Sequence, residues 1–226
     1  MKQLTFADRR TWGGRRKGAG RKPGPRPRVL HRAREVLKYW NPVHVTMRAV
    51  KRLPNLRQQK LYAVVERAIL HTRREDFHIV EFSVQTDHLH LIIEAQSEDA
   101  LSRGIKSFAA RVALRLNIAL GRRGRTGHPK GRVWGDRYHR RDLKNARQVR
   151  NALVYVIANY KKHFGLATGM PRIDPFSSAQ WFEGWTAHRK PPDTPRPSEP
   201  ASTVLLRTAW QKHGFIHPGE APRSPS

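Results

Sequence analysis

Two histidines, His88 and His90, lie two positions apart within residues 86–94, a run that is typical of a β-strand. Side chains on a strand alternate between its two faces, so both imidazoles share one face. The other face is apolar and suited to a core (Leu89, Leu91 and Ile93). Two neutral imidazoles on one face can bind one metal ion. Because His-x-His is a short motif, two exposed polar residues on a half-buried strand explain the spacing equally well.

Tyr155 is the second candidate for chemistry, on a segment from Asn145 to about His163 that predicts a helix. At about 100° per residue, one side of this helix is an apolar stripe (Val149, Ala152, Leu153, Val156, Ile157 and Tyr160). Tyr155 points away from the stripe and lies one turn before Asn159, so both can face the same object. A tyrosine off the core, beside an amide, is a candidate nucleophile; an ordinary exposed tyrosine is the alternative.

The elements that must position these residues are predicted from hydrophobic periodicity. Strands are expected at 43–48, 77–84, 86–94 and 133–139, and helices at 56–74, 97–121 and 145–163. Two strand–helix–strand units favour an α+β, ferredoxin-like antiparallel sheet with helices on one face. The first two helices would cover the apolar face of the third strand and leave the histidine face open to a ligand. The second helix should bury one side (Leu101, Ile105, Phe108, Val112, Leu116 and Ile118).

The net charge of +28 and a pI near 11.6 point to an anionic partner. Nucleic acid is the first expectation and an anionic membrane surface the second. The sequence has no run of about 18 apolar residues, so we expect no transmembrane helix. The absence of cysteine excludes disulfides and thiolate metal sites in this sequence. We expect a cytoplasmic protein.

Residues 1–41 form a basic arm rich in Gly, Pro and Arg, too polar to fold alone. Residues 20–27 look like the core of an AT-hook, which places arginines in narrow minor grooves. A solvated arm that binds phosphates without sequence preference is the favoured interpretation. Its candidate DNA contacts are Arg15, Arg16, Lys17, Arg21, Lys22 and Arg26.

A second basic segment, the Gly-rich loop at 121–131, precedes the last predicted strand. Arginine and lysine side chains on such a loop suit the DNA backbone. The candidates here and nearby are Arg122, Arg123, Arg125, Lys130, Arg132, Arg137 and Lys162. Trp134 and Tyr138 could stack on a base, although a core role for Trp134 is equally open.

The remaining residues, 167–226, are Pro-rich and contain several tryptophans. Residues 191–200 and the closing Pro- and Ser-rich tail have the composition of disordered chain. Residues 203–212 could form one short helix. No role is evident for the tryptophans.

His88-Leu89-His90 followed by Tyr155-Val156-Ile157-Ala158-Asn159 resembles the HUH single-tyrosine transposases, and among them the REP-associated tyrosine transposases most. The order of strands and helices also matches, and so does the sequence of residues 134–138, which precedes the tyrosine helix. The resemblance covers about residues 42–165. It implies a bacterial nuclease in which His88, His90 and Asn159 hold Mg²⁺ or Mn²⁺ and Tyr155 is the nucleophile. Insertion-sequence members often carry glutamine at the Asn159 position, and both side chains offer an amide oxygen.

By this resemblance, the tyrosine cleaves single-stranded DNA next to a hairpin and forms a covalent 5′-phosphotyrosine. The bond energy is kept, so a strand can be rejoined without ATP. The resemblance leaves a monomer and a homodimer open. Two rival interpretations of the sequence are a nucleic-acid-binding protein without catalysis and a metal-dependent hydrolase that activates water. A protein–DNA adduct separates both rivals from a transposase.

Overall fold

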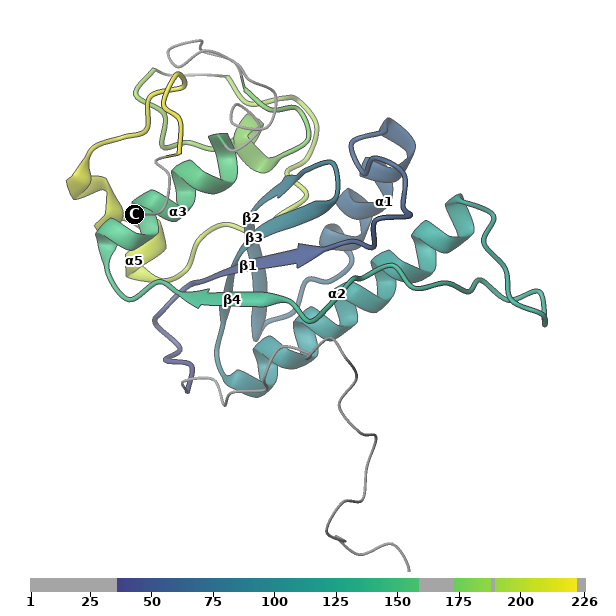
Figure 1. Cartoon of the computed structure of the whole chain (residues 1–226). Helices are drawn as coiled ribbons and strands as arrows, with labels where there is room; N and C mark the ends of the chain where they lie inside the picture. Colours follow the sequence, from purple (N-terminus) through teal and green to yellow (C-terminus); the bar gives the residue numbers. More distant parts are fainter. Residues whose placement is uncertain (1–35, 159–172, 188–189, 223–226) are drawn as a thin grey trace, which may run out of the picture. The chain divides into compact units, whose positions relative to one another are not determined.

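The fold was analysed in a computed structural model, which describes residues 36–158, 173–187 and 190–222 (Figure 1). Residues Val36–Ser226 form one compact unit, separate from Met1–Glu35. All of the candidate contacts predicted in the basic arm lie outside the described residues. Asn159, Tyr160 and Lys162 also lie outside them.

Four antiparallel strands form one sheet in the order β2-β3-β1-β4. They are β1 (Val43–Arg48), β2 (Phe77–Val84), β3 (His88–Ala95) and β4 (His139–Asp142). Val43, Val45 and Met47 are buried between more exposed neighbours, which is the alternation expected of a strand with one face on the core. The strand order confirms the predicted ferredoxin-like α+β fold.

Two helices, α1 (Gln59–Leu70) and α2 (Glu98–Ala119), cover one face of the sheet (Figure 1). Ser97 caps α2, because its side chain accepts a hydrogen bond from the backbone N–H of Ala100. Phe108 and Val112 of α2 pack in a core that includes Leu89 and Leu91 of β3. Ile118, which we expected on the buried side, is 47% exposed, because a position two residues past Leu116 turns to the opposite side of the helix.

The fourth strand lies later in the chain than the sequence predicted. The backbone of Val133 and Trp134 pairs with the continuation of β1 through one hydrogen bond, from the Val50 N–H to the Val133 carbonyl, and an isolated bridge between Trp134 and Ala49. The Asp136 side chain then accepts a hydrogen bond from the backbone N–H of Arg137, an interaction that competes with strand pairing. Regular pairing with β1 therefore begins at His139.

The second face of the sheet is also covered, although we expected it to be open. Helix α3 (Ala146–Ala158) packs on β2 and β3, on the side of the sheet opposite α1 and α2 (Figure 1). Short helical turns of the C-terminal extension pack around α3: η2 (Ser178–Trp181), α5 (Val204–Arg207) and η3 (Ala209–His213). Together they form a second core with Ile92 of β3, and this core includes Trp185 and Trp210.

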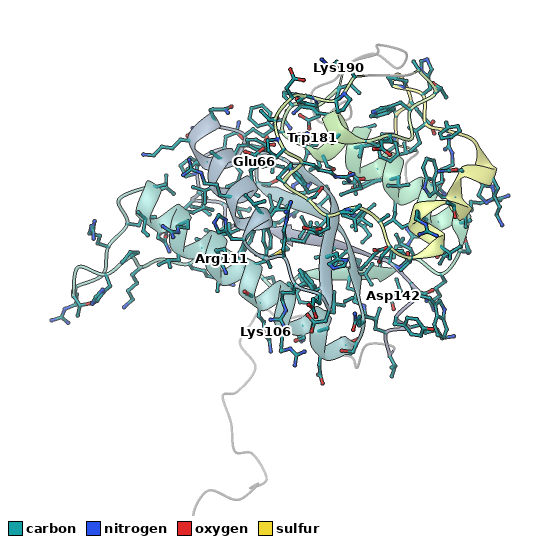
Figure 2. The ribbon with its side chains drawn as sticks, turned by 180° about the vertical axis from the view of Figure 1, so that it is seen from behind. Glu66, Lys106, Arg111, Asp142, Trp181 and Lys190 are labelled. Atoms are coloured by element: carbon teal, nitrogen blue, oxygen red, sulfur yellow. The ribbon has the colours of Figure 1, made fainter. Side chains whose placement is uncertain are left out.

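An ion pair and several hydrogen bonds, all of them partly buried, attach the extension to the sheet. Arg196 binds Glu81 of β2 at 2.8 Å, and Glu94 of β3 accepts hydrogen bonds from the backbone and hydroxyl groups of Ser202 and Thr203. Residues 191–200, which we expected to lack fixed structure, thus include a half-buried residue, Arg196, that anchors the extension to β2. Trp181 and Lys190 lie in this layer, away from Lys106 and Arg111 of α2 (Figure 2).

Candidate functional site

His88 and His90 lie on the face of β3 that looks toward α3. Both are buried, with 6% and 2% of their surface exposed. The two Nε2 atoms are 3.0 Å apart. Strand alternation brings both rings to one point, as the sequence predicted, but the rings are buried, with Tyr155 of α3 against His90.

Each ring has a hydrogen-bond partner for its outer nitrogen, Nδ1. His88 Nδ1 lies 2.6 Å from Asp87 Oδ1, so it donates to the carboxylate. His90 Nδ1 lies 3.1 Å from the Thr46 hydroxyl and 3.2 Å from Nε2 of His44. With a proton on each Nδ1, the two Nε2 lone pairs face each other, and this arrangement is repulsive unless a cation lies between them.

The distance between these nitrogens suits a shared metal ion. Two imidazole nitrogens bound to one ion at a right angle, each at about 2.1 Å, would lie about 3.0 Å apart. A carboxylate on the outer nitrogen, as Asp87 provides for His88, is a common support for a metal-binding histidine. Among the residues that the structure describes, no group of three His, Cys, Asp or Glu is placed to hold a metal. The predicted third ligand, Asn159, is an amide outside those residues.

His44, Thr46 and Asp87 are the site residues that sequence reasoning missed. His44 lies on β1 and is half-buried between His90 and Tyr155. Loss of water around the ring, with His139 and Arg141 nearby, lowers the pKa of His44 to about 4, so the ring is neutral near pH 7. The signal was the alternation of residues 43–48, which places His44 and Thr46 on the histidine face once β1 is known to neighbour β3.

Tyr155 reaches the same site from α3. Its ring centroid lies 5.0 Å from that of His90 and 5.5 Å from that of His44, edge to face in both cases. The helix begins after Asn145, whose side chain accepts a hydrogen bond from the backbone N–H of Gln148. Val156 and Ile157 are buried in the second core, and their packing turns Tyr155 toward the histidines. A phenol and two imidazoles therefore meet at one place.

The basic loop lies elsewhere, beyond the C-terminal end of α2 and away from α3 (Figure 1). Arg123 donates to the Gly127 carbonyl, and Arg132 donates to the carbonyls of Trp134 and Gly135. These bonds shape the loop and leave its cations at the surface. Trp134 donates to the Ala109 carbonyl and packs against the first core, so it has a structural role.

Comparison with known proteins identifies the family. The family model of IS200-like transposases matches residues 39–159, which is more than half of the chain. The protein belongs to this transposase family. No curated protein matches it. A solved structure of a REP-associated tyrosine transposase bound to a REP hairpin shares its fold, with a TM-score of 0.51 and 20% identity over 66% of this chain and 82% of that chain.

Membership of this family makes the protein a transposase, whose class of reaction is DNA transposition. The matched region contains β1 to α3 and so includes both histidines and Tyr155. It ends before the extension that covers α3. No helix in the described parts of the chain is long and apolar enough to cross a membrane.

Proposed function

We propose that this transposase cleaves and rejoins single-stranded DNA through a covalent bond between Tyr155 and the 5′ phosphate. The observation that carries the proposal is the position of the Tyr155 ring beside His90 and His44, with the His88 Nε2 directed to the same point. A nucleophile and a clamp for the scissile phosphate are the two requirements of this reaction.

In the cleavage step, the Tyr155 hydroxyl oxygen forms a bond to phosphorus and the bond from phosphorus to the 3′ oxygen breaks. The hydroxyl proton is lost to solvent, and the 3′ oxygen takes up a proton to become a free hydroxyl. Attack by a 3′ hydroxyl on the phosphotyrosine reverses the step and rejoins DNA. One phosphodiester is exchanged for another, so no ATP is consumed.

His88 and His90, with Asn159 as the third ligand, would hold Mg²⁺ or Mn²⁺, which as a Lewis acid would polarise the scissile phosphate. The chain's own contribution is to hold both Nε2 atoms free of protons. Asp87 does this for His88, and Thr46 and His44 do it for His90. The low pKa of His44 keeps its ring neutral near pH 7, so its Nε2 can accept the His90 proton when the His44 proton is on Nδ1.

The substrate in this proposal is single-stranded DNA beside a hairpin. The hairpin in the related REP-associated transposase structure supports it. The net charge of +28 supplies the attraction to phosphates. The basic arm and the loop at 121–131 carry the proposed backbone contacts, and the exposed side chain of Arg137 is a further one.

The test uses purified protein, Mn²⁺ or Mg²⁺, and labelled hairpin oligonucleotides taken from the DNA that flanks its gene. A denaturing gel should show a protein–DNA adduct for the wild type and for Tyr39→Phe, whose side chain is exposed. The adduct should be absent for Tyr155→Phe and for His88→Ala. Binding without any adduct would favour a non-catalytic protein, and an adduct that survives Tyr155→Phe would assign the nucleophile to another tyrosine.

A further inference from the structure

Two consecutive arginines on the edge strand β4 have opposite surroundings. Arg140 points toward α2, where Asp142 and Glu98 bind its guanidinium and only 3% of its side chain is exposed. Arg141 is exposed and points to the other face of the sheet. The backbone of Arg141 pairs with β1, but its side chain makes no hydrogen bond or ion pair in the described parts of the chain. One arginine therefore holds the fold together, and the other is available to a ligand.

The register of the sheet places Arg141 beside the site. On β1 and β4, Arg141 is opposite His44 and His139 is opposite Thr46, and paired residues share a face. Side chains that are directly opposite have Cβ atoms about 5 Å apart. Arg141 thus lies next to His44, which contacts both His90 and Tyr155.

A second arginine flanks the other end of the site. Arg48, the last residue of β1, is exposed and pairs with His88 across the sheet, on the same face. Four residues separate His44 from Arg48, so the two arginines lie about 13 Å apart along the strand. At this spacing they would contact different phosphates, one on each side of the histidine pair.

Asp87 accepts a hydrogen bond from His88, and this bond, together with the nearby charge of Arg48, lowers the pKa of Asp87. The two other carboxylates of this face have partners of their own. Glu81 is bound by Arg196, and both oxygens of Glu94 accept hydrogen bonds from Ser202 and Thr203. An exposed guanidinium offers paired donors that match the oxygens of a phosphate. The rim formed by β1 and β4 is therefore suited to an anion.

We propose that Arg141 and Arg48 form a phosphate-binding rim, which holds the DNA backbone on either side of the phosphodiester that Tyr155 attacks. This inference rests on the proposed function, because it takes the substrate to be a DNA strand. In this arrangement the DNA strand reaches the site over the β4 edge of the sheet. The basic loop beyond α2 would then bind a different part of the DNA.

The test measures binding in a Tyr155→Phe background, where no cleavage interferes, by fluorescence anisotropy of a labelled hairpin oligonucleotide with a single-stranded flank. Arg141→Gln should reduce the steepness of log affinity against log salt by about one. If the variant and its parent bind equally at about 1 M salt, the variant should then bind about tenfold more weakly than its parent at about 0.1 M salt. Arg48→Gln should act similarly. Arg141→Lys should restore most of the slope, because it keeps the charge.

The matched control is Arg67→Gln, which removes an exposed arginine from α1 on the opposite face of the sheet. Circular dichroism melting checks that each variant is folded. If Arg141→Gln and Arg67→Gln bind alike in affinity and slope, the rim does not exist. If no hairpin yields an adduct with the wild type, the proposed cleavage fails, while the salt slopes still decide whether Arg141 binds phosphate.

Discussion

His44 and Thr46 lead to a prediction about metal affinity. It tests whether these two residues strengthen metal binding by positioning His90, without binding the metal themselves. Both lie within hydrogen-bond distance of His90 Nδ1, at 3.2 and 3.1 Å. The proton on this nitrogen must stay there for Nε2 to bind an ion. His44→Phe removes one acceptor and keeps an aromatic ring beside Tyr155. Thr46→Val removes the other acceptor at nearly constant volume.

The expected size of the effect follows from these two contacts. Loss of the partner that supports a metal-binding histidine typically costs 10- to 100-fold in metal affinity. Because each single variant keeps one of the two acceptors, it should show the lower end of this range, about tenfold weaker binding of Mn²⁺, a cost of about 1.4 kcal/mol. The double variant should reach the upper end, about 100-fold.

Isothermal titration of Mn²⁺ into DNA-free protein measures this directly, without any dependence on cleavage. His71→Phe is the control, since His71 is an exposed histidine at the end of α1. Single variants with unchanged affinity and a double variant equal to the wild type would refute the reasoning. In that case His44 and Thr46 do not hold the proton on His90, or His88 and His90 do not bind the ion.

Further predictions concern the extension. Trp210→Ala should lower the free energy of unfolding by about 3–5 kcal/mol, because it removes a buried indole whose Nε1 donates to the Leu206 carbonyl; urea unfolding with a loss under 1 kcal/mol would contradict its place in the core. Glu94→Ala should cost about 1–3 kcal/mol in the same assay, since Ser202 and Thr203 lose their acceptor. Burial raises the pKa of Glu81 above its ordinary value of 4.5, although Arg196 acts in the opposite direction. The wild type should therefore lose stability relative to Glu81→Gln as the pH rises from 4.5 toward the raised pKa, because the unfolded carboxyl ionises first. Urea unfolding between about pH 4 and 7 measures this difference, and the reverse trend would exclude it.

Local patterns predicted much of the sheet and both halves of the histidine–tyrosine pair. Strands β1 and β2 begin and end where alternation and β-branched residues indicated. Ser97 marked the start of α2 through its side-chain cap. His88 and His90 were found because strand alternation is a nearest-neighbour property, and Tyr155 because helical periodicity separates it from the apolar stripe.

The features that sequence analysis missed depend on contacts between distant parts of the chain. His44 enters the site only through the pairing of β1 with β3. Arg196 lies in a stretch of proline and polar residues whose composition is typical of disordered chain, yet it binds Glu81, 115 residues earlier. No local periodicity encodes such a partner. The open face that we expected is closed for the same reason, since the residues that cover it come last.

The late position of the extension has a consequence for protein synthesis. Glu94 is made 108 residues before Ser202, which caps its carboxylate. At about 5–20 residues per second, this interval lasts about 5–22 s. During translation, the part of this face that α3 does not cover, with Glu81 and Glu94, therefore faces solvent or chaperones until residues 196–203 have left the ribosome. A message cut short before residue 196 would yield a sheet that can never complete its second layer.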